Sequence, residues 1–212
     1  MNFTALLGLS FVCAMGAMSP GPSLAVVLRN TISGGRRQGV LTGVGHGLGF
    51  GIYASIAVMG LSAILLANES LFTILQWSGV AILLWLSYNM LTYTPSDTKE
   101  EHPIGDKRGF VEGFMIAFLN PKILVFLVAV FSQFLDPEMT NNERMIMAML
   151  AGIIDTSWYV LVAAVLAGTP MIDRLRDNSV LIDRMIYSVL IDRMIGTVLI
   201  LLALALVYKS FL

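Results

Sequence analysis

Two proline breaks interrupt apolar runs of this chain, one at Ser19-Pro20-Gly21-Pro22 and the other at Asn120-Pro121-Lys122. Proline removes a backbone donor and its ring clashes with the preceding turn, so each break ends a helix. In lipid, the backbone groups freed in this way need partners within the protein or in a water-filled cavity. Paired interruptions in the two halves of a chain are the pattern that marks a transporter's binding site. The breaks therefore predict a membrane protein of the transporter class.

The composition supports this class. Of 212 residues, 57% are hydrophobic and 13% are charged, whereas soluble domains have about 25% charged residues. The net charge of -1 gives no reason to expect a nucleic-acid partner. Cys13 is the single cysteine, which excludes a disulfide framework, and we expect it to be a small buried apolar residue. No basic residue precedes the first apolar run, so we expect an uncleaved span there rather than a signal peptide.

A spanning helix needs about 20 mostly apolar residues. Six stretches meet this requirement: residues 3–28, 39–67, 71–93, 110–135, 145–168 and 189–208. The sequence thus predicts an all-α integral membrane protein, a single domain of six transmembrane helices over residues 1–212. Three spans per half predict two inverted three-helix repeats, 1–93 and 110–212, joined by a hydrophilic loop at 94–109. Spans one and four are the ones broken by proline.

The basic residues predict the orientation, because loops on the cytoplasmic side carry an excess of Lys and Arg. Ten of the thirteen lie after spans one, three and five: Arg29, Arg36, Arg37, Lys99, Lys107, Arg108, Arg174, Arg176, Arg184 and Arg193. We therefore expect a multi-pass protein of the plasma (inner) membrane, with these three loops in the cytoplasm and both termini on the outer side.

The second span is rich in glycine. Gly43, Gly47 and Gly51 repeat every four residues and form one face, and Gly45 and Gly49 form another. Small residues at this spacing let helix backbones approach closely in lipid. Plain helix packing is the first interpretation, and a flexible helix that lines a substrate path is the alternative.

A tandem repeat precedes the sixth span. Residues 179–186 read SVLIDRMI, and residues 188–195 repeat the same eight letters. A nine-residue period turns a helix by about 900°, so Asp183 and Asp192 would lie on opposite faces of one straight helix. We expect the first copy to form an interfacial or bent extension and the second to enter the sixth span. A duplication without function is the first interpretation, and a regulatory element is the alternative.

Burying an ionisable residue at membrane depth costs free energy, and this chain has few such residues. Lys122 lies beside the second break, Asp155 lies in span five, and His46 lies about two turns into span two; Glu112 is expected at the interface. Half-helices opened by Pro22 and Pro121 favour an anion at their N-termini, such as a carboxylate.

These features fit a small zwitterion. Lys122 would contact a carboxylate, and Asp155 would accept an ammonium group or carry a proton. A structural Lys122–Asp155 ion pair is the alternative. His46 suits a proton relay with Asp155, or is a hydrogen-bonded packing residue. The predicted translocation pathway comprises Ser19, Pro20, Gly21, Pro22, Asn120, Pro121, Lys122 and Asp155.

These residues resemble the LysE/RhtB family of amino-acid exporters. The similarity runs over nearly the whole chain: Met18–Pro22, Gly34–Gly39, Gly60-Leu61, Gly113-Phe114, Asn120-Pro121-Lys122, Gln133-Phe134, Asp155 and Trp158. The resemblance implies a six-span inner-membrane protein that exports amino acids or related small metabolites, driven by the proton gradient through alternating access. The duplication at 179–195 is foreign to the family pattern.

Other classes fit less well. An intramembrane enzyme needs a nucleophile with a base, paired carboxylates or metal ligands, and neither GxSxG nor HExxH occurs. A metal-ion exporter would have a poor ligand set, and Lys122 would repel the cation. We therefore expect no catalytic residue, no bound metal and no cofactor; the partners are an amino-acid-like substrate and the bilayer, with a homo-oligomer left open. The identity of the substrate and the coupling ion are open as well.

Overall fold

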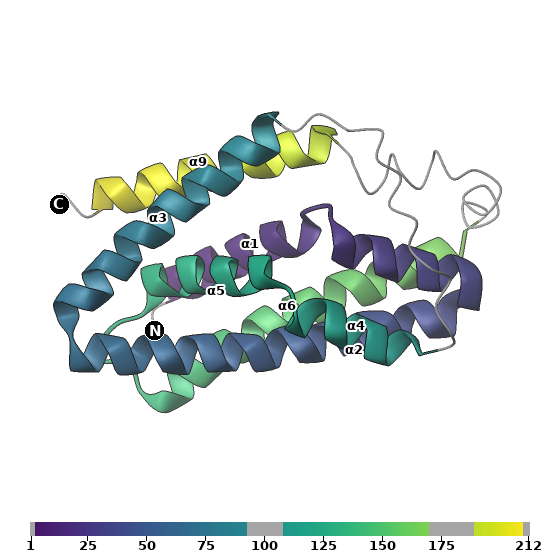
Figure 1. Ribbon diagram of the computed structural model, residues 1–212, viewed down its shortest axis with the longest axis horizontal. Helices are drawn as coiled ribbons and strands as arrows, with labels where there is room; N and C mark the ends of the chain where they lie inside the picture. Colours follow the sequence, from purple (N-terminus) through teal and green to yellow (C-terminus); the bar gives the residue numbers. More distant parts are fainter. Residues whose placement is uncertain (1–2, 93–107, 170–188, 210–212) are drawn as a thin grey trace.

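The computed structural model describes residues 3–92, 108–169 and 189–209, and in these ranges every regular element is a helix. The helices are α1 (Phe3–Met18), α2 (Pro22–Ala67), α3 (Glu69–Thr92), α4 (Gly109–Phe118), α5 (Pro121–Phe134), α6 (Asn141–Ala167) and α9 (Val189–Lys209). Figure 1 shows them as an elongated bundle in which α3 and α9 pack side by side.

Both expected proline breaks are present. α1 ends at Met18 and α2 begins at Pro22, and α4 ends at Phe118 before α5 begins at Pro121. Each proline occupies the first helical position, where its missing N–H does no harm. The α4–α5 pair bends by 57° at its break. Asn120 caps α5, because its side-chain oxygen accepts a hydrogen bond from Lys122 N at 3.0 Å.

The connection between the first two predicted spans differs from the expectation. Helical structure continues past residue 28 and resumes before residue 39, so α2 is 46 residues long with one interruption at Gly35. Gly35 has φ 72°, a left-handed conformation that favours glycine. The chain reverses there, because Asn30 Nδ2 donates to Thr42 Oγ1 at 2.9 Å across twelve residues. A straight helix would separate them by about 18 Å. The two parts of α2 thus form a helical hairpin.

The glycine faces of α2 are packing surfaces. A methyl group at Gly43 or Gly47 would lie within 2.9 Å of α6 atoms, against Val160 and Thr156 respectively. Gly45 lies as closely against the Phe110 carbonyl of α4, so the second glycine face serves a second helix. The packing interpretation is therefore confirmed, and α2 is the helix against which α4 and α6 dock.

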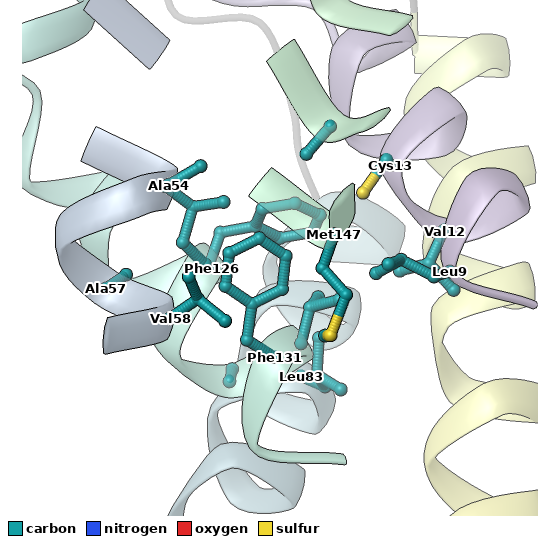
Figure 2. Close-up of a cluster of buried hydrophobic side chains, with 14 of the residues drawn as sticks. Leu9, Val12, Cys13, Ala54, Ala57, Val58, Leu83, Phe126, Phe131 and Met147 are labelled. Carbon is teal, nitrogen blue, oxygen red and sulfur yellow. The ribbon is translucent and has the colours of Figure 1, made fainter. Parts of the chain in front are cut away.

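The core lies where α1, α2, α5 and α6 meet α3. Leu9, Leu83, Leu127 and Phe131 are fully buried there, and Figure 2 shows Leu9 and Val12 on one side of Met147 with Phe126 and Phe131 on the other. Cys13 belongs to this cluster as a buried free thiol, which confirms the expectation of a small apolar residue.

The outer surface is apolar as well, as in a protein surrounded by lipid. Phe3, Leu66, Trp85 and Met194 each expose more than 60% of their surface. So many exposed large apolar side chains are unusual for a soluble protein. Three described helices (α2, α3 and α6) are long and apolar enough to cross a membrane, and the bent pair of α4 and α5 makes a fourth if it is counted as one span; α1 is a shorter apolar helix. The count of six spans and the inverted repeat stay predictions.

Some predicted features lie outside the described residues: most of the loop 94–109 and the first copy of the tandem repeat, residues 179–186. The second copy is helical from Val189 onward and opens α9, as expected. In Figure 1 the beginning of α1 and the end of α9 lie at the end of the bundle opposite the start of α4.

Candidate functional site

The two proline breaks face one small internal cavity of about 80 Å³. Its wall combines the first break, the second break and the middle of α2 and α6: Ser19, Pro20, Gly21, Pro22, Ser23, His46, Asn120, Lys122, Asp155 and Tyr159 are among its lining residues. The structure therefore brings together all the residues predicted for the pathway except Pro121, which lines a neighbouring cavity.

His46 lies at the centre of a buried polar chain. Its Nδ1 lies 2.6 Å from Asp155 Oδ2, and its Nε2 lies 2.8 Å from Ser23 Oγ. All three residues are at least 92% buried, so water does not compete for these hydrogen bonds. The Tyr159 ring packs on the imidazole with a centroid distance of 4.5 Å, and its side chain also interacts with Ser23.

The local sequence explains this geometry. Ser23 is the second residue of α2, so its hydroxyl lies directly behind the first break. His46 and Asp155 come from the middle of α2 and α6, which the contact between Gly47 and Thr156 brings into close approach. A larger residue at position 47 would separate these backbones and lengthen the His46–Asp155 hydrogen bond.

The suggested Lys122–Asp155 ion pair is wrong. Within the described residues, the ion pairs closer than 4.0 Å are His46–Asp155 and Arg29–Glu112. Asp155 is turned toward His46, whose Nδ1 lies on the facing helix within hydrogen-bond distance of its carboxylate. Lys122 is attracted instead to Asp192 of α9.

A second cavity of about 550 Å³ adjoins the first. Pro20, Gly21, Pro22 and Lys122 line both, and Pro121, Trp85, Asn89 and Asp192 line the second alone. This volume is in the usual range for small-molecule sites, roughly 300–1,000 Å³. The breaks thus lie between a small cavity at His46, which has a mostly apolar wall, and a larger cavity between α5, α3 and α9.

A polar cluster ties the Gly35 hairpin to α4. Arg29 Nη2 donates to Glu112 Oε2, and Asn30 Nδ2 donates to the same oxygen at 2.9 Å. Gly109 N donates to Gln38 Oε1 at 3.1 Å. The Glu112 side chain is 25% exposed, and its ion pair with Arg29 was not foreseen. Its place at the membrane interface stays a prediction.

Sequence reasoning missed three residues of these cavities. Ser23 has a weak signal, since a polar residue directly after Pro22 belongs to the first turn of a half-helix. Tyr159 follows Trp158 four residues after Asp155, which places it one helical turn away on the same face. Asp192 has no local signal, because only the packing of α9 against α3 brings it near Lys122.

The part of the chain that the structure describes contains no group of three His, Cys, Asp or Glu residues able to hold a metal ion. His46 and Asp155 supply one nitrogen and one carboxylate, and the third neighbour, Ser23, is a weak ligand.

Comparison with known proteins places the chain among membrane translocators. The family model described as LysE type translocator matches residues 14–210. An uncharacterized membrane protein of Escherichia coli K12, YahN, is 30% identical over 151 residues, 68% of this chain and 67% of that protein. The threonine efflux protein of E. coli K12 is 27% identical, covering 76% of this chain and 81% of its own length. The leucine efflux protein of Enterobacter sp. strain 638 is 29% identical, covering 67% of each. No solved structure matches the chain.

Proposed function

The chain belongs to the family of LysE type translocators, and from this premise we propose that it exports amino acids or related small metabolites across the inner membrane. The observation that carries the proposal is the meeting of two proline-broken helices at cavities that contain Lys122, His46 and Asp155. Relatives named as threonine and leucine efflux proteins agree with this substrate class.

We infer that proton movement uses the chain of Ser23, His46 and Asp155. When His46 is neutral and donates from Nδ1 to Asp155, its Nε2 accepts a hydrogen bond from the Ser23 hydroxyl. When His46 is protonated, Nε2 must donate, so the Ser23 hydroxyl turns and offers its own proton elsewhere. One proton at His46 thus reverses a hydrogen bond directly behind the first break.

This reversal supports a coupling mechanism. Ser23 lines the small cavity together with both breaks, so a change of its hydrogen bonding alters the donors and acceptors that face the substrate path. Alternating access then opens one end of the inverted repeats while the other end stays closed. The cluster of Arg29, Asn30 and Glu112, which joins the Gly35 hairpin to α4, is the closed end in this proposal.

The test is amino-acid export by cells that express the chain. Cells are challenged with a panel of amino acids and their dipeptides, and intracellular and medium concentrations are measured over time. We expect resistance to one or a few amino acids, with faster efflux that collapses when an uncoupler removes the proton gradient. Equal growth and equal efflux with and without the chain, for every amino acid, would contradict the proposal.

A second candidate function follows from one observation. Ser23 Oγ, His46 Nε2, His46 Nδ1 and Asp155 Oδ2 are connected in the order of a Ser-His-Asp hydrolase, with distances of 2.8 and 2.6 Å. No local sequence motif marks this arrangement, because its three residues lie far apart in the sequence. A fluorophosphonate probe separates the two functions: labelling that disappears in Ser23→Ala favours acyl hydrolysis, and we expect no labelling at Ser23, because this hydroxyl lies in a cavity of only about 80 Å³.

A further inference from the structure

We propose that Asp192, in the second copy of the tandem repeat, binds the ammonium group of a zwitterionic substrate while Lys122 binds its carboxylate. This inference rests on the proposed function and adds a substrate-binding residue to it. It moves the ammonium contact from Asp155, where the sequence placed it, to the larger cavity.

The charges of Lys122 and Asp192 face the same space. Both residues line the cavity of about 550 Å³ and attract each other electrostatically, yet they form no contact ion pair within the described residues. No distance between their charged atoms is 4.0 Å or less, so a ligand that carries both charges has room between them. A zwitterion carries one charge of each sign and could therefore bridge Lys122 and Asp192.

Asp192 is built into the wall rather than displayed on the surface. It is 8% exposed and lies in the first turn of α9. Close packing of Gly196 against the Ser87 carbonyl fixes that end of α9 on α3. Its carboxylate accepts no hydrogen bond from the described part of the chain. Neither of its oxygens is fully enclosed, so both can be reached from the cavity. Such a carboxylate is free to accept the N–H groups of a ligand in the cavity.

The opposite wall favours a carboxylate. Lys122 is the second residue of α5, and the N-terminal ends of α5 and α2 both face this cavity through Pro121 and Pro22. Helix N-termini attract anions and reinforce the charge of Lys122. The anionic Asp192 comes from the other side of the cavity, on α9.

The remaining wall selects the side chain. Leu86, Met90 and Val125 supply its apolar part together with Trp85, which lies where the cavity opens at the outer surface, and Asn89 is an additional polar side chain. Among the described residues that line this cavity, Lys122 and Asp192 are the charged ones, so a charged substrate side chain would lack a partner there once the zwitterion occupies both. The geometry therefore points to neutral amino acids with apolar side chains as the substrate class.

Transport of radiolabelled L-leucine by proteoliposomes of the purified chain tests the inference. Loss of a charge-assisted hydrogen bond predicts that Asp192→Asn raises the half-saturating concentration about tenfold or more. Glu138→Gln, the same chemical change at an exposed loop residue, is the matched control and leaves it unchanged. Asp192→Glu keeps the charge and restores part of the affinity, which a merely structural role would not predict.

Leucine analogues that lack either the carboxylate or the amino group test the Lys122 contact and the Asp192 contact separately. In Asp192→Asn, inhibition by 3-methylbutylamine, which lacks the carboxylate, is lost, while inhibition by 4-methylpentanoate, which lacks the amino group, is retained. Lys122→Gln gives the opposite pattern. Unchanged half-saturation in Asp192→Asn, or equal loss of both inhibitors in both variants, overturns the inference while leucine transport by the unmodified chain still supports the proposed function. Absence of transport of any amino acid by the unmodified chain overturns both.

Discussion

At the scale of single residues, the hydrogen-bonded chain from Ser23 through His46 to Asp155 places ionisable groups in the tightly packed interior. Asp155 and His46 are nearly inaccessible, and each has its main polar partner in the other. Removing one partner of such a pair leaves the other unsatisfied in a medium that cannot solvate it. A substitution of either residue therefore also changes the hydrogen bonding of the other.

Asp155→Asn is expected to abolish export while the protein still reaches the membrane. Asparagine keeps the volume and one hydrogen bond to His46, but it cannot exchange a proton. The measurement is the initial efflux rate divided by the amount of chain in isolated membranes, with Glu138→Gln as the control. Export at the unmodified rate would remove Asp155 from the mechanism.

Ser23→Ala is expected to uncouple transport from the proton gradient rather than to stop it. The substitution leaves His46 Nε2 without its 2.8 Å partner, so protonation of the imidazole no longer reorients a hydroxyl beside the break. We expect the ratio of efflux with and without an imposed pH gradient to fall toward one. Ser23→Thr retains a hydroxyl and serves as the matched variant, which should stay coupled. If both variants stay coupled to the proton gradient, Ser23 is excluded from the relay.

At the scale of helices, the central feature is α2, which folds back on itself and carries α4 and α6 against its two glycine faces. Lipid does not drive apolar helices together, so close backbone approach has to provide the attraction. The positions of His46 and of Glu112 both depend on these contacts, since each side chain reaches across the same helix interfaces.

Gly113→Ala tests this dependence. A methyl group there would lie 2.0 Å from the Thr42 carbonyl oxygen, so α4 has to move away from α2, and we expect a loss of roughly 1–3 kcal/mol in stability. Gly60→Ala is the control, because no atom lies within 4 Å of its added methyl group and alanine favours the helix by about 0.5–1 kcal/mol. Thermal unfolding of both variants in detergent measures the difference. Equal midpoints would argue against the close α2–α4 contact.

At the scale of the whole molecule, the orientation in the membrane is the main open prediction. In a Cys13→Ala background, a membrane-impermeant maleimide applied to intact cells should label Glu138→Cys but not Arg37→Cys. Both positions are exposed, and the excess of basic residues places Arg37 on the cytoplasmic side. Permeabilised cells are the control and should label both. The reverse pattern would invert the predicted topology.

The proline breaks and the glycine faces could be predicted because their causes are local. Pro22 and Pro121 end helices through their own covalent geometry, and glycines four residues apart share a helix face in any helix. The extent of α2 could not be predicted, because basic residues such as Arg36 and Arg37 look like a loop although they continue the helix after Gly35.

By itself the sequence determined an all-helical membrane chain with two proline breaks, and it identified Lys122, His46 and Asp155 as the ionisable candidates for the functional site. Only the tertiary structure decided which groups lie near them: Asp155 and Ser23 hydrogen-bond to His46, whereas Lys122 and Asp192 line one cavity without a contact ion pair. The reason is physical. Helix periodicity fixes which residues share a face, whereas the partner of a buried charge depends on which face of a distant helix packs against it, and side-chain packing between helices decides that.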